Sequence, residues 1–210
     1  MPCRVEHAQR YNRPMDLSAR VAHHFRDAAA LFERSQRDLA EPIVAAGEAL
    51  FLALSSDCKI LACGNGGSAA DAQHFIAELV GRFERERLPL AGITLNTDTS
   101  ILTAVANDYG YADVFARQVQ ALGQPGDVLV ALSTSGQSAS VVRAVQAAQE
   151  RDMPVIALTG KGGGQIATLL TANDIHLCVP HDRTMRIQEV HGLILHVLCD
   201  LVDAQLLGDS

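Results

Sequence analysis

The sequence predicts an α/β protein: a three-layer sandwich with a five-stranded parallel sheet, preceded by N-terminal helices. Five short, almost continuously apolar runs are each bounded by turn residues, and stretches of helical periodicity separate them. Continuous apolar runs are typical of parallel strands covered by helices on both faces, because neither face of such a strand meets water. A chain of 210 residues, 48% of them hydrophobic, is long enough to form one such domain.

The N-terminal part divides into an extension and a helical region. Residues 1–15 are polar, lack the apolar centre of a signal peptide, and are predicted to be a flexible extension to a single domain at 16–210. From residue 16 to about residue 56, apolar residues recur every three to four positions. We expect two helices here, meeting near Arg37.

The five predicted strands are KILAC (59–63), LAGITL (90–95), DVLVAL (127–132), PVIALT (154–159) and IHLCV (175–179). A long helix with an apolar stripe follows, from about Thr184 to Leu207. In this architecture ligands bind at the carboxyl ends of the strands. The loops that directly follow the predicted strands are therefore the first places to look for a site.

Composition argues against two classes of partner. The net charge of −7 disfavours a nucleic-acid surface, and we found no apolar run that approaches the ~20 residues needed to span a bilayer. The five cysteines are scattered and form no C-x-x-C pair, which is typical of reduced thiols in a reducing compartment. We therefore expect a cytoplasmic protein that binds neither nucleic acid nor membrane.

Two glycine-rich loops could hold a phosphate, but neither matches a nucleotide motif well. GNGGSA (64–69) fits G-x-G-x-x-A, yet the nearest acidic residue after the next strand, Asp98, lies further along than a dinucleotide site requires. TGKGGG (159–164) fails the P-loop pattern because Gly162 follows Lys161 where Ser or Thr is needed. A strand-to-helix turn is the favoured interpretation of the second loop.

The segment LSTSGQSASVV predicts a phosphate site of another kind. Its hydroxyl-bearing residues crowd a strand-to-helix junction, with the helix expected to begin at about Ser138: they are Ser133, Thr134, Ser135 and Ser138. Free N–H groups and the positive end of the helix dipole favour an anion there. A simple N-cap explains one or two hydroxyls but not this density.

The helix after the first glycine loop carries a candidate set for acid–base or metal chemistry. His74, Glu78 and Arg82 are spaced four residues apart and so lie near one face. His and Glu on adjacent turns can share a metal or act as an acid–base pair, whereas the plainer alternative is a solvated ion pair.

The last helix carries Gln188, Glu189, His191 and His196. His196 lies in the apolar run LILHVLCDLV, where a histidine is usually a satisfied core residue rather than a ligand. Gln188 and His196 are about 12 Å apart along a straight helix, so one metal would stretch both side chains. Either different subunits supply the two, or only one is a close ligand; an interfacial site in a symmetric oligomer is the favoured solution.

In order along the chain, CGNGGSAADAQHF, E-L-x-x-R-F (78–83), AND (106–108), GDVLVALSTSGQSASVV, ALTGKGGG and RIQEVH resemble the phosphoheptose isomerases, enzymes of the SIS (sugar isomerase) domain family. The resemblance covers residues 16 to 207 approximately. It implies a flavodoxin-like SIS fold and conversion of sedoheptulose 7-phosphate to D-glycero-D-manno-heptose 7-phosphate, for the heptose of lipopolysaccharide. It also implies a cytoplasmic homotetramer with interfacial active sites, and one Zn²⁺ or other divalent ion per subunit.

The resemblance further implies roles for individual residues. Glu78 and His196 resemble the family's general base and general acid. The implied metal ligands are His74, Glu78, Gln188 and His196. The implied substrate contacts are Asn65, Gly66, Gly67, Glu78, Asn107, Asp108, Ser133, Thr134, Ser135, Ser138 and Gln188. Arg82 is either an orienting partner of Glu78 or a surface ion-pair residue.

A second branch of the family is a competing identification. RFERER (82–87), ITLNTD and LCDLVD also resemble a SIS scaffold protein that associates with the DnaA replication initiator. Such a scaffold can lose the acid–base residues, whereas Glu78 and His196 are both present here. The isomerase is therefore favoured, and RFERERL is interpreted as a solvated helix end.

Overall fold

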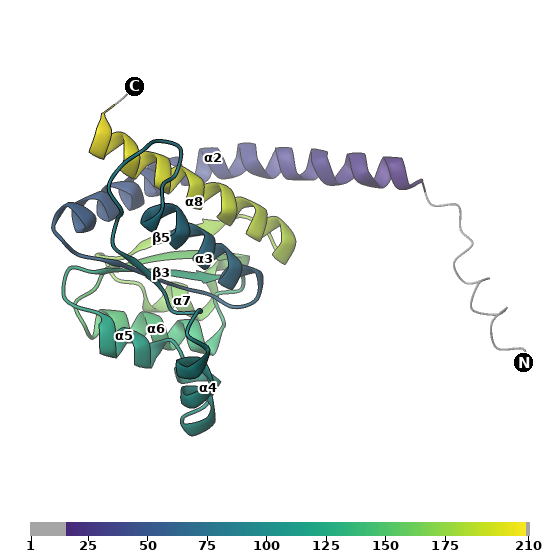
Figure 1. The fold of residues 1–210 in the computed structure, drawn as a ribbon. Coiled ribbons are helices and arrows are strands. Elements are labelled where there is room, and N and C mark those ends of the chain that lie inside the picture. The colour runs from purple at the N-terminus through teal and green to yellow at the C-terminus, as the bar shows by residue number, and fades with distance from the viewer. Residues whose placement is uncertain (1–15, 209–210) are drawn as a thin grey trace, which may run out of the picture.

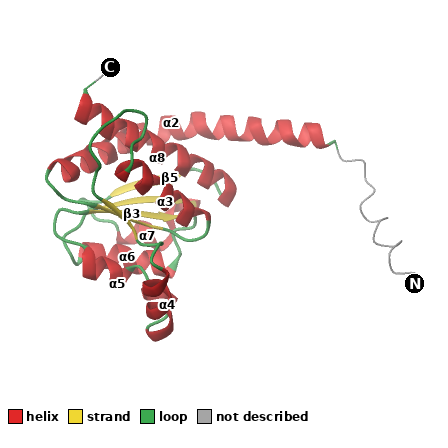
Figure 2. Cartoon of the chain, viewed as in Figure 1, coloured by secondary structure: helices red, strands yellow, loops and turns green. Residues whose placement is uncertain are grey.

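The computed structural model describes residues 16–208 and confirms the predicted fold class. The predicted extension, residues 1–15, lies outside the described residues. One sheet of five parallel strands has the order β2-β1-β3-β4-β5. Its strands, yellow in Figure 2, lie between the helices. The strands are β1 (Ile60–Cys63), β2 (Gly92–Thr94), β3 (Val128–Ser133), β4 (Val155–Gly160) and β5 (Ile175–Val179).

The helices form a layer on each face of the sheet (Figure 1). On one face lie α2 (Leu17–Ser55), α3 (Gly67–Val80) and α8 (Thr184–Leu207). The other face is covered by α5 (Ala116–Leu122), α6 (Ala139–Gln149) and α7 (Gly164–Leu169). The remaining helical segments are α4 (Thr99–Asp108), η1 (Tyr111–Asp113) and η2 (Lys161–Gly163).

Alternate residues of each central strand enter two separate cores. Ile60 and Ala62 of β1 pack with the α2, α3 and α8 layer, whereas Leu61 and Cys63 pack with the α5 and α6 layer. Successive side chains of a strand point to opposite faces, so a strand covered on both sides must be apolar at every position. This is why the strands were recognisable as continuous apolar runs.

The prediction of two N-terminal helices was wrong, because α2 is one helix of 39 residues with Pro42 inside it. Proline removes one backbone hydrogen bond and normally kinks or ends a helix. Here the helix continues because its second half is packed: Leu39, Ala46 and Leu50 are buried, and a Cβ on Gly47 would lie 2.8 Å from Leu201 of α8. The first half of α2 extends beyond the sheet (Figure 1).

The expectation that no segment could span a membrane also needs correction. By length and composition alone, α8 is long and apolar enough to do so. In the fold it is a core helix, since Ile187, Ile194, Leu198 and Val202 are buried in the core that it shares with α2 and α3.

The strand order places the site. The chain moves outward from β1 to β2 and then returns to the other side of β1 as β3. The strand order therefore reverses between β1 and β3, and the carboxyl ends of strands at such a reversal are where sheets of this kind bind ligands. The first glycine loop follows β1 and the serine-rich loop follows β3.

Candidate functional site

The loops that follow β1 and β3 meet through Asn65. Its amide nitrogen donates to the hydroxyl oxygens of Ser138 (2.8 Å) and Ser140 (2.9 Å). Its amide oxygen accepts a hydrogen bond from the Tyr111 hydroxyl at 2.8 Å. Asn65 therefore fixes the glycine loop against the start of α6, so two of the predicted substrate-binding segments form one surface.

The serine loop is shaped to accept an anion. Ser138 is the N-cap of α6, as predicted, but its hydroxyl makes no capping bond, since it accepts from Asn65 instead. The first N–H groups of the helix thus have no side-chain cap and remain available to a negatively charged ligand. Ser133 is the last residue of β3, and Ser135 accepts from the Gln137 N–H, which holds the intervening turn.

Glycine is required where the serine loop touches the second glycine loop. Gly136 has φ +62°, and a Cβ there would lie 1.8 Å from the carbonyl oxygen of Gly163. The carbonyl of Gly136 accepts from the Ile166 N–H of α7 at 3.0 Å. The TGKGGG segment is therefore a strand-to-helix turn, as favoured, and its glycines allow backbone to pack on backbone.

The first glycine loop contacts Asn96, which follows β2, and Gln188 of α8. Asn96 donates to the Gly64 carbonyl (2.8 Å) and accepts from the Gly64 N–H (3.3 Å). Gly66, the N-cap of α3, has φ +59°, a conformation that favours glycine. A Cβ on Gly67 would lie 2.4 Å from the Gln188 amide nitrogen. Gln188 therefore lies against the start of α3, beside the first glycine loop.

The acid–base residues form a second cluster, between α3 and α8. The Nε2 atoms of His74 and His196 lie 2.9 Å apart, and His74 Nε2 lies 3.5 Å from Glu78 Oε1. The side chain of His74 is 52% exposed and that of Glu78 is 22% exposed. A cavity of about 230 Å³, lined by Phe83, Glu84, His196, Val197 and Asp200, opens beside this cluster.

The donor atoms of this cluster suit a divalent metal, but their spacing is that of a hydrogen-bonded pair. Zinc binds imidazole nitrogen at about 2.0–2.1 Å, which puts two nitrogens of a tetrahedral site roughly 3.4 Å apart. At 2.9 Å, one Nε2 of the His74–His196 pair carries a hydrogen and donates it to the other. Within residues 16–208, no group of three or more His, Cys, Asp or Glu side chains is spaced to hold a metal as it stands.

The four predicted metal ligands thus separate into two places. His74, Glu78 and His196 come together, whereas Gln188 lies two turns away at the glycine loop. Because Gln188 meets Gly67 and His196 meets His74, α8 and α3 run side by side in the same direction. Within a single chain, Gln188 and His196 therefore lie far apart, as the sequence indicated, and only His196 is near His74.

Two further predicted contacts lie on α4. Asn107 and Asp108 are exposed at its C-terminal end, where the Asn107 amide donates to the Asp108 carboxylate at 2.7 Å. Tyr111, which anchors Asn65, follows within three residues but was not singled out from the sequence. A tyrosine directly after Gly110, a glycine with φ +97°, is the only local signal for it.

The charged segment after α3 contains both exposed and buried arginines. Arg82 lies 3.9 Å from Glu86 on the surface, and no interaction among the described residues joins it to Glu78. The interpretation of RFERERL as a solvated helix end was wrong: α3 ends at Val80, the segment is an irregular loop, and the side chain of Arg87 is only 3% exposed.

The two histidines of α8 lie in different environments. His196, in the apolar run, is exposed beside His74. His191 is the core histidine: its Nε2 donates to the Thr159 carbonyl at 3.0 Å, and its Nδ1 has no partner among the described residues. Burial lowers the pKa of His191 to about 4, so the ring is neutral.

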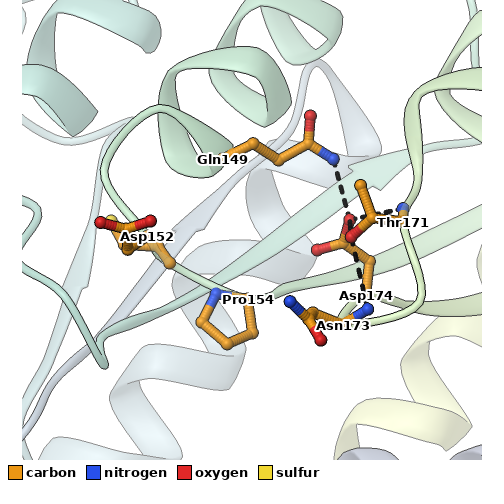
Figure 3. Close-up of a pocket in the computed structure, with 7 residues that line it drawn as sticks. Gln149, Asp152, Pro154, Thr171, Asn173 and Asp174 are labelled. Atoms are coloured by element: carbon orange, nitrogen blue, oxygen red, sulfur yellow. Dashed lines mark hydrogen bonds between the residues drawn. The ribbon is translucent and has the colours of Figure 1, made fainter.

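Another cavity lies away from both clusters, at the amino ends of β4 and β5 (Figure 3). It measures about 450 Å³ and surrounds Asp174. That carboxylate is already occupied, since it accepts hydrogen bonds from Gln149, Val155 and Thr171. The cavity therefore belongs to the hydrogen-bonded loop before β5, and the loops after β1 and β3 remain the candidate site.

Comparison with known proteins agrees with this geometry. The family model of the SIS domain matches residues 23–160. A phosphoheptose isomerase from Bordetella avium is 69% identical over 93% of this chain and the whole of that protein. The structure of phosphoheptose isomerase GmhA from Neisseria gonorrhoeae superposes with a TM-score of 0.85 at 55% identity, covering 90% of this chain and 99% of that one.

A phosphoheptose isomerase structure from Francisella tularensis has a TM-score of 0.87 at 40% identity, again covering 90% of this chain and 99% of that one. The residues matched by the SIS-domain model include the loops after β1 and β3 and the helix α3. The chain belongs to the phosphoheptose isomerase family of SIS-domain proteins, and it is by class a phosphosugar isomerase.

Proposed function

We propose that this protein interconverts sedoheptulose 7-phosphate and D-glycero-D-manno-heptose 7-phosphate through an enediol. One observation carries the proposal: Glu78 and His196, from two different helices, converge on His74, and α3 links that cluster to the loops after β1 and β3. The names of the similar proteins in Bordetella avium and Neisseria gonorrhoeae support the same substrate class.

The phosphate belongs, in this proposal, at the serine loop. Ser133, Thr134, Ser135 and Ser138 offer hydroxyls beside the uncapped start of α6. Asn65, Gly66, Gly67 and Gln188 border the sugar, with Asn107 and Asp108 as further contacts from α4. His74 is seven residues from Gly67, or roughly 10 Å along the helix, so an extended seven-carbon sugar could connect the two ends.

The isomerisation moves one proton between C1 and C2. Glu78 removes the C1 proton of the ketose while His196 donates a proton to the C2 oxygen, which gives the enediol. Glu78 then returns its proton to C2, and His196 recovers one from the C1 hydroxyl as the aldehyde forms. The His74–His196 hydrogen bond orients the acid, and the bound phosphate aligns the sugar with both groups.

A zinc or other divalent ion would be held by His74, Glu78 and His196, with Gln188 as the fourth candidate. Both imidazoles would have to present a lone pair from Nε2, which requires loss of the proton that they now share. When bound, the ion would polarise the carbonyl oxygen of the substrate.

We further propose a homotetramer with interfacial active sites. An apolar groove of about 270 Å³ between α2 and α8 is lined by residues including Phe32, Ile43, Leu193, Val197 and Leu201. The projecting part of α2 adds an unpartnered stripe at four-residue spacing: Leu17 (65% exposed), Val21 (57%) and Phe25 (74%). A second copy of the chain would bury both surfaces.

The remaining expectations are also part of this proposal. The product would supply the heptose of lipopolysaccharide, and the enzyme would act in the cytoplasm without binding nucleic acid or membrane. The acidic net charge supports the absence of a nucleic-acid partner, and the scattered cysteines support a reducing compartment.

The deciding experiment is turnover of sedoheptulose 7-phosphate by the purified protein, with and without added zinc, followed by NMR for the aldose. Glu78→Gln is the matched control, because it retains the size of the side chain and removes its basicity. Turnover that disappears in this variant supports the isomerase and the base. No turnover with any metal, from a folded oligomer, would reject the enzyme and redirect attention to binding of the replication initiator.

A further inference from the structure

The loop between α3 and β2 contains a buried cation that the reaction scheme above does not use. Arg87 lies in a segment of alternating charges, yet its side chain is only 3% exposed, and so is that of its partner Asp203 on α8. Burying an ion pair is costly, and an apolar pair of the same volume is often at least as stable. Stability alone is therefore a weak explanation for this pair.

The guanidinium connects the two helices that carry the acid–base residues. Its Nε donates to Asp203 Oδ1 at 2.6 Å. Nη2 donates to the backbone carbonyl of Glu78 itself, and Nη1 to that of Leu79, both at 2.8 Å. Nη1 also lies 3.2 Å from the Leu88 carbonyl, which closes the loop around the cation.

These contacts connect Arg87 to the helices that carry Glu78 and His196. The carbonyls of Glu78 and Leu79 belong to the last turn of α3, where carbonyl groups lack helical partners and a cation is favourable. Asp203 follows His196 by seven residues, two turns further along α8. Its Oδ2 has no partner in the described part of the chain, so Arg87 alone orients the carboxylate.

We propose that Arg87 and Asp203 are positioning residues for the isomerisation, fixing the backbone of Glu78 relative to the helix that presents His196. The inference rests on the proposed roles of Glu78 and His196. Displacement of a catalytic group by about 1 Å can cost on the order of 100-fold in rate, so loss of this connection should lower kcat. Neither residue touches the serine loop, so KM should change little.

Arg87→Lys tests the geometry while retaining the charge. One ammonium group can pair with Asp203 but cannot also reach both carbonyls of α3. We expect kcat to fall about tenfold or more, with KM within twofold and the melting temperature nearly unchanged. The matched control is Arg85→Lys in the same loop. Among residues 16–208, the one hydrogen bond of Arg85 goes to the Gly208 carbonyl, at 2.7 Å, so kcat of this variant should match the wild type.

A second variant separates positioning from folding if Arg87→Lys proves unstable. Arg87→Met combined with Asp203→Leu removes both charges together and so avoids an unpaired buried ion. A stable double variant with low kcat supports the proposal. Wild-type kcat in either Arg87 variant would overturn it, and so would a rise in KM equal to the fall in kcat/KM.

The readout must also distinguish failure of this inference from failure of the proposed function. If the wild-type protein converts no sedoheptulose 7-phosphate, the function is wrong, and the connection is then judged by the ¹³C carbonyl shifts of Glu78 and Leu79. Those shifts should move in Arg87→Lys and stay in place in Arg85→Lys. Unmoved shifts would overturn the connection in either case.

Discussion

The two ends of the candidate site differ in how complete they are within one chain. At the phosphate end, the loops after β1 and β3 are joined through Asn65, and the serine loop packs on the backbone of the second glycine loop. At the acid–base end, His74 is half exposed, and Gln188 lies two turns from the other predicted ligands. One end is preorganised by its own chain, and the other is open on one side.

This difference separates two tasks. An anion site built from backbone N–H groups and short hydroxyls needs only a fixed loop, which the sheet edge provides. Proton transfer needs several long side chains to converge, and an exposed cluster between α3 and α8 can still be completed by a neighbouring subunit. Changes at the acid–base end should therefore lower kcat, whereas changes at the phosphate end should raise KM.

The largest expected effect is at the acid–base end. Replacing His196 with Gln removes the proposed proton donor and breaks its hydrogen bond to His74. We expect kcat to fall by about 10²–10⁴-fold, the usual contribution of a general acid or base, with little change in KM. Steady-state kinetics with sedoheptulose 7-phosphate provide the measurement. A variant with wild-type kcat and raised KM would place His196 in substrate binding instead.

The second effect is a loss of stability at low pH, and it comes from the buried His191. Its ring is hydrogen-bonded to Thr159 of β4, which pairs with Ser133 of β3. Its pKa of about 4 lies below the ordinary 6.5, so the unfolded chain binds the proton more tightly. The contribution of His191 to the free energy of unfolding is thus complete above pH 6.5 and is lost between pH 6.5 and 4. The loss is on the order of 3 kcal/mol.

Urea unfolding at several pH values measures this loss. His191→Gln is the control, since the Gln amide can still donate to the Thr159 carbonyl but does not titrate. The slope of stability against pH between 6.5 and 4 should be smaller in the variant. Identical slopes would show that His191 takes up no proton when the protein unfolds.

The histidines of α8 also show where sequence analysis succeeds and where it fails. Strands, loops and the serine-rich junction were predictable because apolar runs and turn residues are local signals. The exposure of His196 and the burial of His191 were not, because they depend on which face of α8 meets β4. The predictions for Pro42 and Arg87 failed for the same reason. Packing against α8 decides both the continuity of α2 and the burial of Arg87.

A moderate effect is expected from Ser138→Ala at the phosphate end. The change removes one hydroxyl of the proposed phosphate site and the acceptor that Asn65 uses at 2.8 Å. A neutral hydrogen bond contributes about 0.5–1.5 kcal/mol, so KM should rise by about three- to tenfold while kcat is retained. Kinetics with inorganic phosphate as a competing ligand would show a parallel rise in its inhibition constant. An equal loss of kcat would mean that the two ends are not separable.

The smallest effect should come from Tyr111→Phe, which removes a single hydroxyl from the back of the glycine loop. That hydroxyl donates to Asn65 at 2.8 Å, on the side of the amide opposite Ser138 and Ser140. Without it Asn65 keeps both serine bonds, so the loop should loosen without opening, and KM should rise by about twofold or slightly more. Tyr109→Phe is the matched control, because the Tyr109 ring lies under the Arg117 guanidinium, 4.0 Å from its central carbon. A rise in KM in both variants would point to a general effect of the segment that carries the two tyrosines. A rise only in Tyr111→Phe would show that a residue outside the loops after β1 and β3 helps to hold the phosphate end.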